Sequence, residues 1–431
     1  MYLYLKIGYF VKLFFLITFL GLFTYTILTF YTFQTAYSNM SQLELNQDKI
    51  EIFSNPEVKQ QDIRTDKFKN LKYVLLWTSY NNNTENIIGE GQTPFFENRC
   101  TYTNCFLTGD KYLLNEDYTK FDAVIFDVHQ LQVWDVKNLP ISRSLHQKYI
   151  FYGKVSSEDF PICSAYSNKY FNWTWSYKLD SDIVSPFIEV RDFDGNVVAP
   201  KLNVNWEPKM SVISEAVKEQ LKQKKKAIAW INKKCQSRDN RMVFAKRLQI
   251  AFKQSSLDFD IYGCGKLVCS RKSCLETIKR DYYFYFSPED SNMDDYVSAG
   301  VLTAYDQFAV PIVYGGANYS KFLPEASYIN AGTTSIDKLV ALVEYIIRNP
   351  NIYYNFHRWR NHYVISETEK FNGICEVCEY LNDLSKFGVV SIKSNFRRWW
   401  YTRPLFERCF PKSHDRPDVL SYVNNSRRTL H

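Results

Sequence analysis

Cysteine is the residue type whose spacing in this chain first suggests chemistry. Cys375 and Cys378 form a C-x-x-C pair, which can act as a redox centre or as half of a zinc site. The sequence has no second C-x-x-C and no His pair to complete a zinc site, and no other cluster with metal-ligand spacing. We therefore predict structural disulfides and no metal site, with pairings that spacing does not decide. The other cysteines are Cys100, Cys105, Cys163, Cys235, Cys264, Cys269, Cys274 and Cys409.

Asparagine forms a second chemical pattern, the Asn-x-Ser/Thr tripeptide that accepts N-linked glycans. Together with the cysteines, these tripeptides are compatible with a glycosylated protein in an oxidising, lumenal compartment. The predicted glycosylation sites are Asn39, Asn82, Asn172, Asn318 and Asn424.

An apolar segment near the N-terminus predicts a membrane anchor. Residues 13–33 are 21 residues without a charge, and a helix of that length rises about 30 Å, the thickness of a bilayer core. Lys6 and Lys12 precede the segment and the first acidic residue after it is Glu44, so residues 1–12 are predicted to stay in the cytoplasm. A cleaved signal peptide is the alternative, although its apolar region is usually only about 7–15 residues long.

The net charge of +7 is confined to the C-terminal end. Residues 386–431 hold ten Lys or Arg and three acidic residues, which is the whole excess. The rest of the chain is balanced, so the sequence predicts no nucleic-acid partner. Residues 383–431 are predicted to be a basic tail, either solvated or in contact with anionic lipid or glycan. The aromatic run at 396–401 could instead pack on the folded body.

Hydrophobic runs predict two α/β domains after a polar stem at residues 34–70. Short apolar runs that are far apart in sequence are typical of parallel strands joined by crossovers. In the first domain, 71–195, these runs lie at 73–77, 123–126 and 149–152. Residues 192–208 are rich in turn formers and are interpreted as an interdomain linker.

The second domain, predicted at 209–382, alternates strands and helices in the pattern of a doubly wound nucleotide-binding fold. The fold class is thus α/β, with two halves and a cleft between them. The expected helices are 211–222, 241–252 and 294–308, and the expected strands are 227–231, 259–262, 282–286 and 310–314.

Several segments, in order through both domains, resemble the α-1,3/α-1,4-fucosyltransferases, glycosyltransferase family 10. The resemblance covers roughly residues 71–382. It implies two Rossmann-like domains facing a cleft, the glycosyltransferase-B type. The segments are Phe171-Asn-Trp-Thr-Trp-Ser-Tyr-Lys-Leu-Asp-Ser-Asp182, Ala229-Trp230, Arg241, Asp260-Ile-Tyr-Gly263, Glu289-Asp-Ser291, Asp295-Tyr-Val297, Val310-Pro-Ile-Val-Tyr-Gly315, Asn318-Tyr-Ser-Lys-Phe-Leu-Pro324, Arg358-Trp-Arg360 and Cys375-x-x-Cys378.

The resemblance implies a type II Golgi membrane enzyme that transfers fucose from GDP-fucose to GlcNAc of a glycoprotein glycan with inversion, without an obligatory metal. By position, Arg241 would contact the diphosphate, Tyr262 and Tyr296 would line the donor pocket, and Glu289 with Asp290 would match the family's F-E-N-S segment. Each has a plainer alternative: a surface arginine, packed core tyrosines, and a Glu that caps a helix. Asp180-Ser-Asp182 could suggest a metal site, but it belongs to the acceptor-domain segment and is interpreted as structural.

The departures from the family pattern bear on catalysis. Where the family has E-S-P, with Glu as the candidate base, this chain has Val155-Ser-Ser157, and where the family has Glu-Lys at the donor site it has Ala299-Gly300. Losing a general base costs a factor of about 10²–10⁴ in rate. Glu158 is the candidate substitute base, and Lys234 a candidate substitute cation; both are alternatively plain surface charge. The second hypothesis is therefore a catalytically silent member that acts as a Golgi glycan-binding or chaperone-like protein.

Overall fold

The computed structural model describes residues 71–77, 89–128, 131, 139–162, 165–232, 235, 241–264, 267–369, 371–389 and 391–402. All of them belong to the unit Asn70–His431. The predicted anchor at 13–33 and stem at 34–70 lie outside the described residues. Within the described ranges, no helix combines the length and apolar character needed to cross a bilayer.

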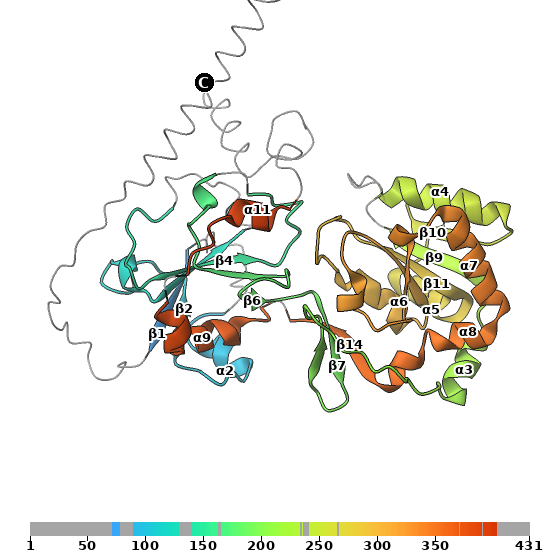
Figure 1. Ribbon diagram of the computed structural model, residues 1–431, viewed down its shortest axis with the longest axis horizontal. Coiled ribbons are helices and arrows are strands. Elements are labelled where there is room, and N and C mark those ends of the chain that lie inside the picture. The colour runs from blue at the N-terminus through green and yellow to red at the C-terminus, as the bar shows by residue number, and fades with distance from the viewer. Residues whose placement is uncertain are drawn as a thin grey trace, which may run out of the picture. The chain divides into compact units, whose positions relative to one another are not determined.

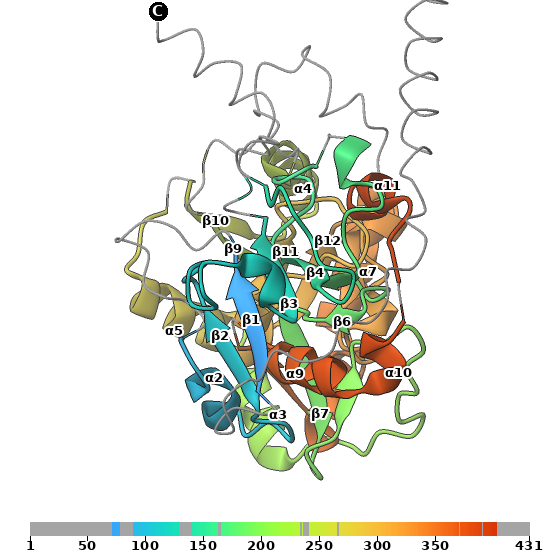
Figure 2. The same cartoon turned by 90° about the vertical axis from the view of Figure 1, so that its left-hand side faces the viewer.

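Parallel strands form the sheet of the first half of the unit, which we call the N-lobe (Figure 2). Its central strands are runs of buried apolar residues, as expected for a parallel sheet that is covered on both faces. The runs predicted at 73–77, 123–126 and 149–152 are confirmed as β1, β3 and β4 to within one or two residues. In order across the sheet, the strands are β2 (Cys105–Thr108), β1 (Lys72–Leu76), β3 (Ala123–Asp127), β4 (Lys148–Gly153), β5 (Trp173–Ser176) and β6 (Ile183–Val184).

A second parallel sheet forms the C-lobe, and the strands predicted there are confirmed. Their spatial order is that of a doubly wound fold of the 2-1-3-4-5 kind, with the order reversing between β9 and β11. The strands are β10 (Phe259–Gly263), β9 (Lys226–Asn232), β11 (Tyr282–Pro288), β12 (Val310–Tyr314) and β13 (Ile329–Asn330). The helices are α3 (Glu215–Lys222), α4 (Arg241–Gln254), α5 (Arg271–Asp281), α6 (Leu302–Asp306), α7 (Ile336–Arg348) and α8 (Pro350–Asn355).

The predicted helix at 294–308 is wrong in its first turn. Residues 294–298 are irregular, the short 3-10 helix η5 begins at Ala299, and α6 follows it. Asp295 adopts a left-handed backbone with φ of 59°, which a helix cannot continue through. Ser298 then caps the new start by accepting a hydrogen bond from the Gly300 N–H.

The predicted linker also contains regular structure. Its start belongs to a three-stranded antiparallel sheet made of β7 (Ile188–Asp192), β8 (Val197–Ala199) and β14 (Tyr363–Glu367). Gly195, with φ of 88°, makes the tight turn between β7 and β8. The segment that leaves the C-lobe, β14, thus pairs with β7, which precedes the C-lobe in the chain.

The end of the chain returns to the N-lobe, which corrects the predicted domain boundary at 382. Helix α9 (Ile374–Asn382) buries Ile374, Val377 and Leu381 in the core beneath β1 and β3, and it lies beside α2 (Thr93–Glu97; Figure 1). Helices α10 (Leu384–Phe387) and α11 (Phe396–Trp400) follow. Residues 371–402 therefore belong to the N-lobe rather than to the C-terminal domain and a tail.

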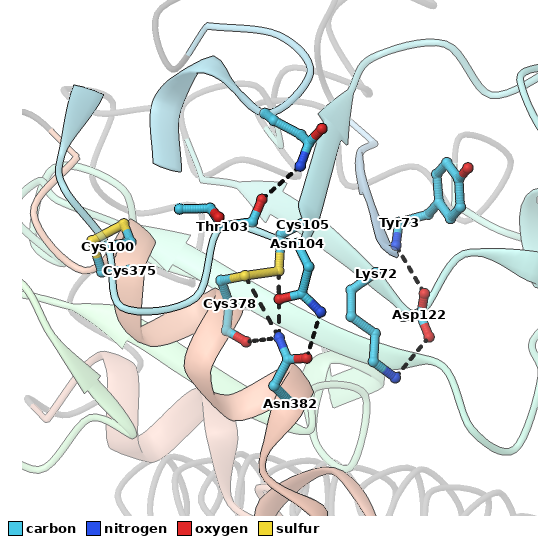
Figure 3. The surroundings of a disulfide bond; sticks show 11 residues. Lys72, Tyr73, Cys100, Thr103, Asn104, Cys105, Asp122, Cys375, Cys378 and Asn382 are labelled. Atoms are coloured by element: carbon cyan, nitrogen blue, oxygen red, sulfur yellow. Dashed lines mark hydrogen bonds and ion pairs between the residues drawn. A yellow bond between two sulfur atoms is a disulfide. The ribbon is translucent and has the colours of Figure 1, made fainter. Parts of the chain in front are cut away.

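Two disulfides fasten α9 to the N-lobe (Figure 3). Cys100 bonds to Cys375, and Cys105 bonds to Cys378. Beside them, the Asn104 side chain donates to Asn382 Oδ1 at 2.8 Å. Both C-x-x-C cysteines are thus structural, so the redox and zinc alternatives are wrong. The described residues hold two further disulfides, Cys235–Cys264 and Cys269–Cys274.

The aromatic run at 396–401 packs on the N-lobe. For this part of the predicted tail, the alternative of packing on the folded body is therefore the correct one. Phe396, Trp400 and Tyr401 are fully buried in one N-lobe core cluster. The Trp400 ring lies 4.7 Å from that of Phe151, and its Nε1 donates to the Phe160 carbonyl at 2.7 Å. Residues 403–431 lie outside the described part of the chain.

Candidate functional site

A cavity of about 460 Å³ opens where the C-lobe strand order reverses. Doubly wound sheets bind their ligands at this point, beside the carboxyl ends of the strands. The cavity continues along α6 as far as Asp306 and Gln307. Its lining residues are Trp230, Ile231, Asn232, Arg241, Leu275, Tyr285, Phe286, Ser287, Pro288, Asp290, Ser298, Gly300, Thr303, Asp306 and Gln307.

Arg241, which the resemblance implies as the diphosphate contact, is one of the residues that line this cavity. It is the first residue of the 14-residue helix α4, so its guanidinium is combined with the positive end of a helix. Of the described residues that line the cavity, Arg241 is the cation, and Asp290 and Asp306 are the carboxylates. The arrangement favours an anionic group at the start of α4.

Glu289 lies behind the cavity wall rather than in it. Both of its carboxylate oxygens accept hydrogen bonds from the Ser298 N–H, at 3.1 Å each. Burial raises the pKa of Glu289 to about 8, against the opposing effects of the Ser298 bonds and the Arg241 charge. A Cβ at Gly315 would lie 2.9 Å from Glu289 Cγ, so the glycine leaves room for this side chain. Glu289 thus fixes the start of η5, which is the helix-capping alternative, and thereby places Ser298 and Gly300.

Asp290 lines the cavity, and Tyr296 supports Asp290 from outside the lining. The Tyr296 hydroxyl donates to Asp290 Oδ1 at 3.0 Å. The Tyr296 ring is buried, with its centroid 5.4 Å from that of Tyr177 and 5.2 Å from that of Phe187. Burial and the Asp290 charge both raise the pKa of the Tyr296 hydroxyl, so it remains a hydrogen-bond donor. Tyr296 is not one of the lining residues.

The geometry does not support a ligand contact for Tyr262. Its side chain is buried in the C-lobe core, and its hydroxyl is hydrogen-bonded to that of Tyr282 at 2.8 Å. Tyr282 in turn donates to Asp260. Tyr262 is absent from the lining of the cavity, so the packed-core alternative describes it better.

Glu158, the candidate substitute base, lies in the N-lobe loop after β4 and reaches the loop that carries Asp290. Its Oε2 accepts from Ser291 Oγ at 3.2 Å and from the Asn292 N–H at 3.1 Å. Val155, at the position of the family's candidate base, packs against the N-lobe core. Lys234, the candidate substitute cation, lies outside the described residues.

The sequons separate into two kinds. Asn172 is buried: its Oδ1 accepts from the Tyr149 N–H at 2.8 Å, and its Nδ2 donates to the Ser391 carbonyl at 2.8 Å. The prediction of a glycan at Asn172 is therefore wrong for the folded chain, because the amide nitrogen is enclosed and in use. Asn318 is exposed at the start of a short 3-10 helix. Asn39, Asn82 and Asn424 lie outside the described residues.

In the Asp180-Ser-Asp182 segment, the Asp182 carboxylate has a structural role. Asp182 Oδ2 accepts from the N–H and the hydroxyl of Thr174, at 2.8 and 2.7 Å. Across the described ranges, no three His, Cys, Asp or Glu side chains gather in a way that could hold a metal ion.

Sequence reasoning missed most of the cavity wall. Asn232, Thr303 and Asp306 belong to it, yet each reads as an ordinary strand-end or helix residue. Ser298 offered a signal, since a serine that precedes a helix is a typical cap. The predicted helix began too early for that signal to be used.

Family models match both lobes. Residues 69–188 match the model "Fucosyltransferase, N-terminal", and residues 221–395 match the model "Glycosyltransferase family 10 (fucosyltransferase) C-term". The chain belongs to glycosyltransferase family 10. The resemblance identified from the sequence is thereby confirmed, and as a family-10 member the chain is a glycosyltransferase.

Individual family-10 relatives are distant. Alpha-(1,3)-fucosyltransferase C of Drosophila melanogaster is 28% identical over 346 residues, covering 76% of this chain and 77% of the relative. Glycoprotein 3-alpha-L-fucosyltransferase A of the same fly is 24% identical over 338 residues, covering 77% of this chain but 60% of the relative. A crystal structure of an alpha1,3-fucosyltransferase with GDP is 12% identical with a TM-score of 0.42, covering 80% of this chain and 96% of that one.

Proposed function

We propose that this family-10 member is an α-1,3-fucosyltransferase that moves fucose from GDP-fucose to GlcNAc of a glycoprotein glycan with inversion. The observation that carries the proposal is the cavity where the C-lobe strand order reverses, with Arg241 at the start of α4. A nucleotide diphosphate is the kind of ligand that this position in a doubly wound sheet accommodates. The N-lobe would provide the acceptor side.

Arg241 would act on the leaving group. In an inverting transfer, the acceptor hydroxyl attacks the anomeric carbon while the bond to the diphosphate breaks, and negative charge grows on the diphosphate. A guanidinium at a helix N-terminus stabilises that charge through directed donors. A base must also take the proton of the acceptor hydroxyl, and Val155 cannot do so.

The second hypothesis, a silent glycan-binding or chaperone-like member, keeps specific support. Val155 is half-buried and packs against the N-lobe core. The residues that the family uses to accept the proton, at position 155, and to supply donor-site charge, at positions 299 and 300, are replaced in this chain. Glu158 is already hydrogen-bonded to the opposite lobe. These features favour binding without turnover.

We also propose that residues 13–33 anchor the protein in the Golgi membrane with the lobes lumenal. The disulfides that join α9 to the N-lobe support an oxidising compartment. Expression of the tagged full chain, followed by microscopy with a Golgi marker and protease protection of sealed vesicles, tests this. Digestion of the lobes in intact vesicles would contradict the orientation.

Two measurements on the full chain, purified in detergent, separate the hypotheses. Calorimetry reports GDP binding, and radiolabelled GDP-fucose with a panel of glycan acceptors reports transfer. Under the proposal, Arg241→Ala weakens GDP binding about 10–100-fold, because it removes a charged hydrogen-bond donor. Lys246→Ala, which removes an exposed cation from the same helix, is the matched control.

Each combination of results has a meaning. GDP binding together with transfer supports the enzyme. GDP binding without transfer to any acceptor supports the silent member. Failure of the folded parent to bind GDP would overturn the donor site itself.

A further inference from the structure

A closed ring of hydrogen bonds joins the N-lobe loop after β4 to the C-lobe loop after β11. The Glu158 N–H donates to Ser156 Oγ at 3.0 Å, and Ser156 Oγ donates to Ser291 Oγ at 2.6 Å. Ser291 Oγ donates to Glu158 Oε2 at 3.2 Å, which closes the ring. The Asn292 N–H donates to the same carboxylate oxygen at 3.1 Å. Each serine hydroxyl thus both donates and accepts within the ring.

The ring is enclosed, and the C-lobe loop has little room to move. Ser156 and Ser291 are each only 2% exposed. On the other side of the loop, a Cβ at Gly316 would lie 2.6 Å from the Asn292 carbonyl oxygen. Residues 289–292 are therefore held between the Glu158 ring and the 315–316 backbone. Asp290, in the middle of this segment, is a wall residue of the cavity.

A second attachment of Asp290 also depends on the N-lobe. Tyr296 donates to Asp290, and its ring packs edge-on against Tyr177 of the N-lobe. The Leu179 N–H donates to Asp295 Oδ2 at 3.1 Å, next to Tyr296 in sequence. N-lobe groups therefore contact two segments that follow Asp290, residues 291–292 and residues 295–296.

We propose that Glu158 is a positioning residue: from the N-lobe, its carboxylate holds the 290–292 loop so that Asp290 presents an acceptor to the hydroxyl groups of a bound nucleotide sugar. This inference rests on the proposed function, because it takes the cavity to be the GDP-fucose site. A carboxylate accepts hydrogen bonds from sugar hydroxyls at low cost in reorganisation when it is already held in place. Glu158 therefore couples the N-lobe to donor binding.

This role differs from that of a general base. A base must take a proton from the acceptor hydroxyl, whereas Oε2 of Glu158 already accepts from Ser291 and Asn292. Protonation there would break the ring that holds the loop. Glutamine at 158 offers an amide oxygen to the same two donors but cannot take a proton, so the conservative variant separates the two roles.

The test measures donor binding by calorimetry on the full chain with GDP-fucose and no acceptor. Glu158→Ala should weaken binding about tenfold, equivalent to about 1.4 kcal/mol, and Glu158→Gln should stay within about threefold of the parent. Glu325→Ala removes an exposed carboxylate of the C-lobe and is the control. Melting temperatures establish that each variant is folded, and Glu158→Gln keeps the test decisive if the alanine variant does not fold.

A double-mutant cycle tests whether the effect passes through Asp290. In an Asp290→Ala background, Glu158→Ala should cause no further loss of GDP-fucose affinity. Equal and additive losses would show that Glu158 does not act through Asp290 and would overturn the proposal.

The remaining outcomes are distinct from one another. A folded parent that binds neither GDP nor GDP-fucose would overturn the proposed function and this inference with it. A parent that binds donor while Glu158→Ala binds equally well would overturn the inference alone. If Glu158→Ala binds donor as tightly as the parent while Glu158→Gln loses about 10²–10⁴ in kcat, Glu158 is the base, and the positioning role is wrong.

Discussion

A lysine at position 300 should strengthen GDP binding if the C-lobe cavity holds a diphosphate. Gly300 lines the cavity and is exposed. A Cβ there would meet only Ser298 Oγ, at 3.3 Å, so a longer side chain can be accommodated with a small adjustment. The cavity is poor in positive charge, with Arg241 opposed by Asp290 and Asp306. An added ammonium group would therefore find a bound diphosphate incompletely neutralised.

The size of the expected gain in GDP affinity depends on how exposed position 300 is to solvent. A hydrogen bond between charged groups contributes about 1.5–3 kcal/mol when shielded from water. Because position 300 is exposed, solvent screening and side-chain ordering favour the lower end of that range. The expected gain in GDP affinity is thus about tenfold. It should shrink as salt rises towards about 1 M, where the Debye length falls to about 3 Å.

Calorimetric titration of GDP into parent, Gly300→Lys and Gly300→Gln measures the effect. The glutamine variant has a similar length without the charge, so the ratio of the two affinities isolates electrostatics from contact area. The reasoning is refuted if Gly300→Lys melts with the parent but binds GDP no more tightly than Gly300→Gln. The diphosphate would then lie away from η5.

Three further predictions follow from other parts of the structure. Burial raises the pKa of Glu289 from 4.5 to about 8. The contribution of this raised pKa to stability is therefore complete below pH 4.5 and is lost as pH rises to about 8. The melting temperature of Glu289→Gln should fall less than the parent's between these pH values, and an identical pH dependence of the two melting temperatures would contradict this prediction. In denaturant titrations, Trp400→Ala should lower the free energy of unfolding by about 3–5 kcal/mol. The control Arg398→Ala, at an exposed position, should lower it by less than about 0.5 kcal/mol. Equal effects of the two substitutions would exclude packing of α11 on the N-lobe. When the chain is expressed in a secretory pathway, Asn318→Gln should remove one endoglycosidase-sensitive mobility shift. Asn172→Gln should remove no such shift but should lower the melting temperature. Loss of a glycan in Asn172→Gln would contradict the burial of Asn172.

Much of the fold could be predicted because its signals are local. Buried parallel strands are short apolar runs, and the seven runs identified from the sequence are all strands in the structure. Arg241 and Asp290 could be placed at the site by resemblance, since family motifs are read in sequence order. The cavity that contains both agrees with that placement.

Other features depend on contacts between residues far apart in sequence. Asp295 adopts a left-handed backbone and its carboxylate accepts from the Leu179 N–H, which a local helix pattern does not reveal. Tyr262 looked like a pocket residue by position, but its hydroxyl is taken by Tyr282. Asn172 satisfies a glycosylation pattern, yet its amide is enclosed by β4 and the returning chain.

The sequence by itself determined the two α/β lobes, the family and the position of the candidate donor site. These depend on hydrophobic runs and motif order, which the linear chain carries. Only the tertiary structure decided that residues 371–402 complete the N-lobe and that Glu158 reaches the Asp290 loop. The physical reason is that burial and hydrogen-bond satisfaction are properties of neighbours in space: Phe396, Trp400 and Tyr401 of a basic, exposed-looking run become core, and a candidate base becomes a carboxylate already engaged by two donors.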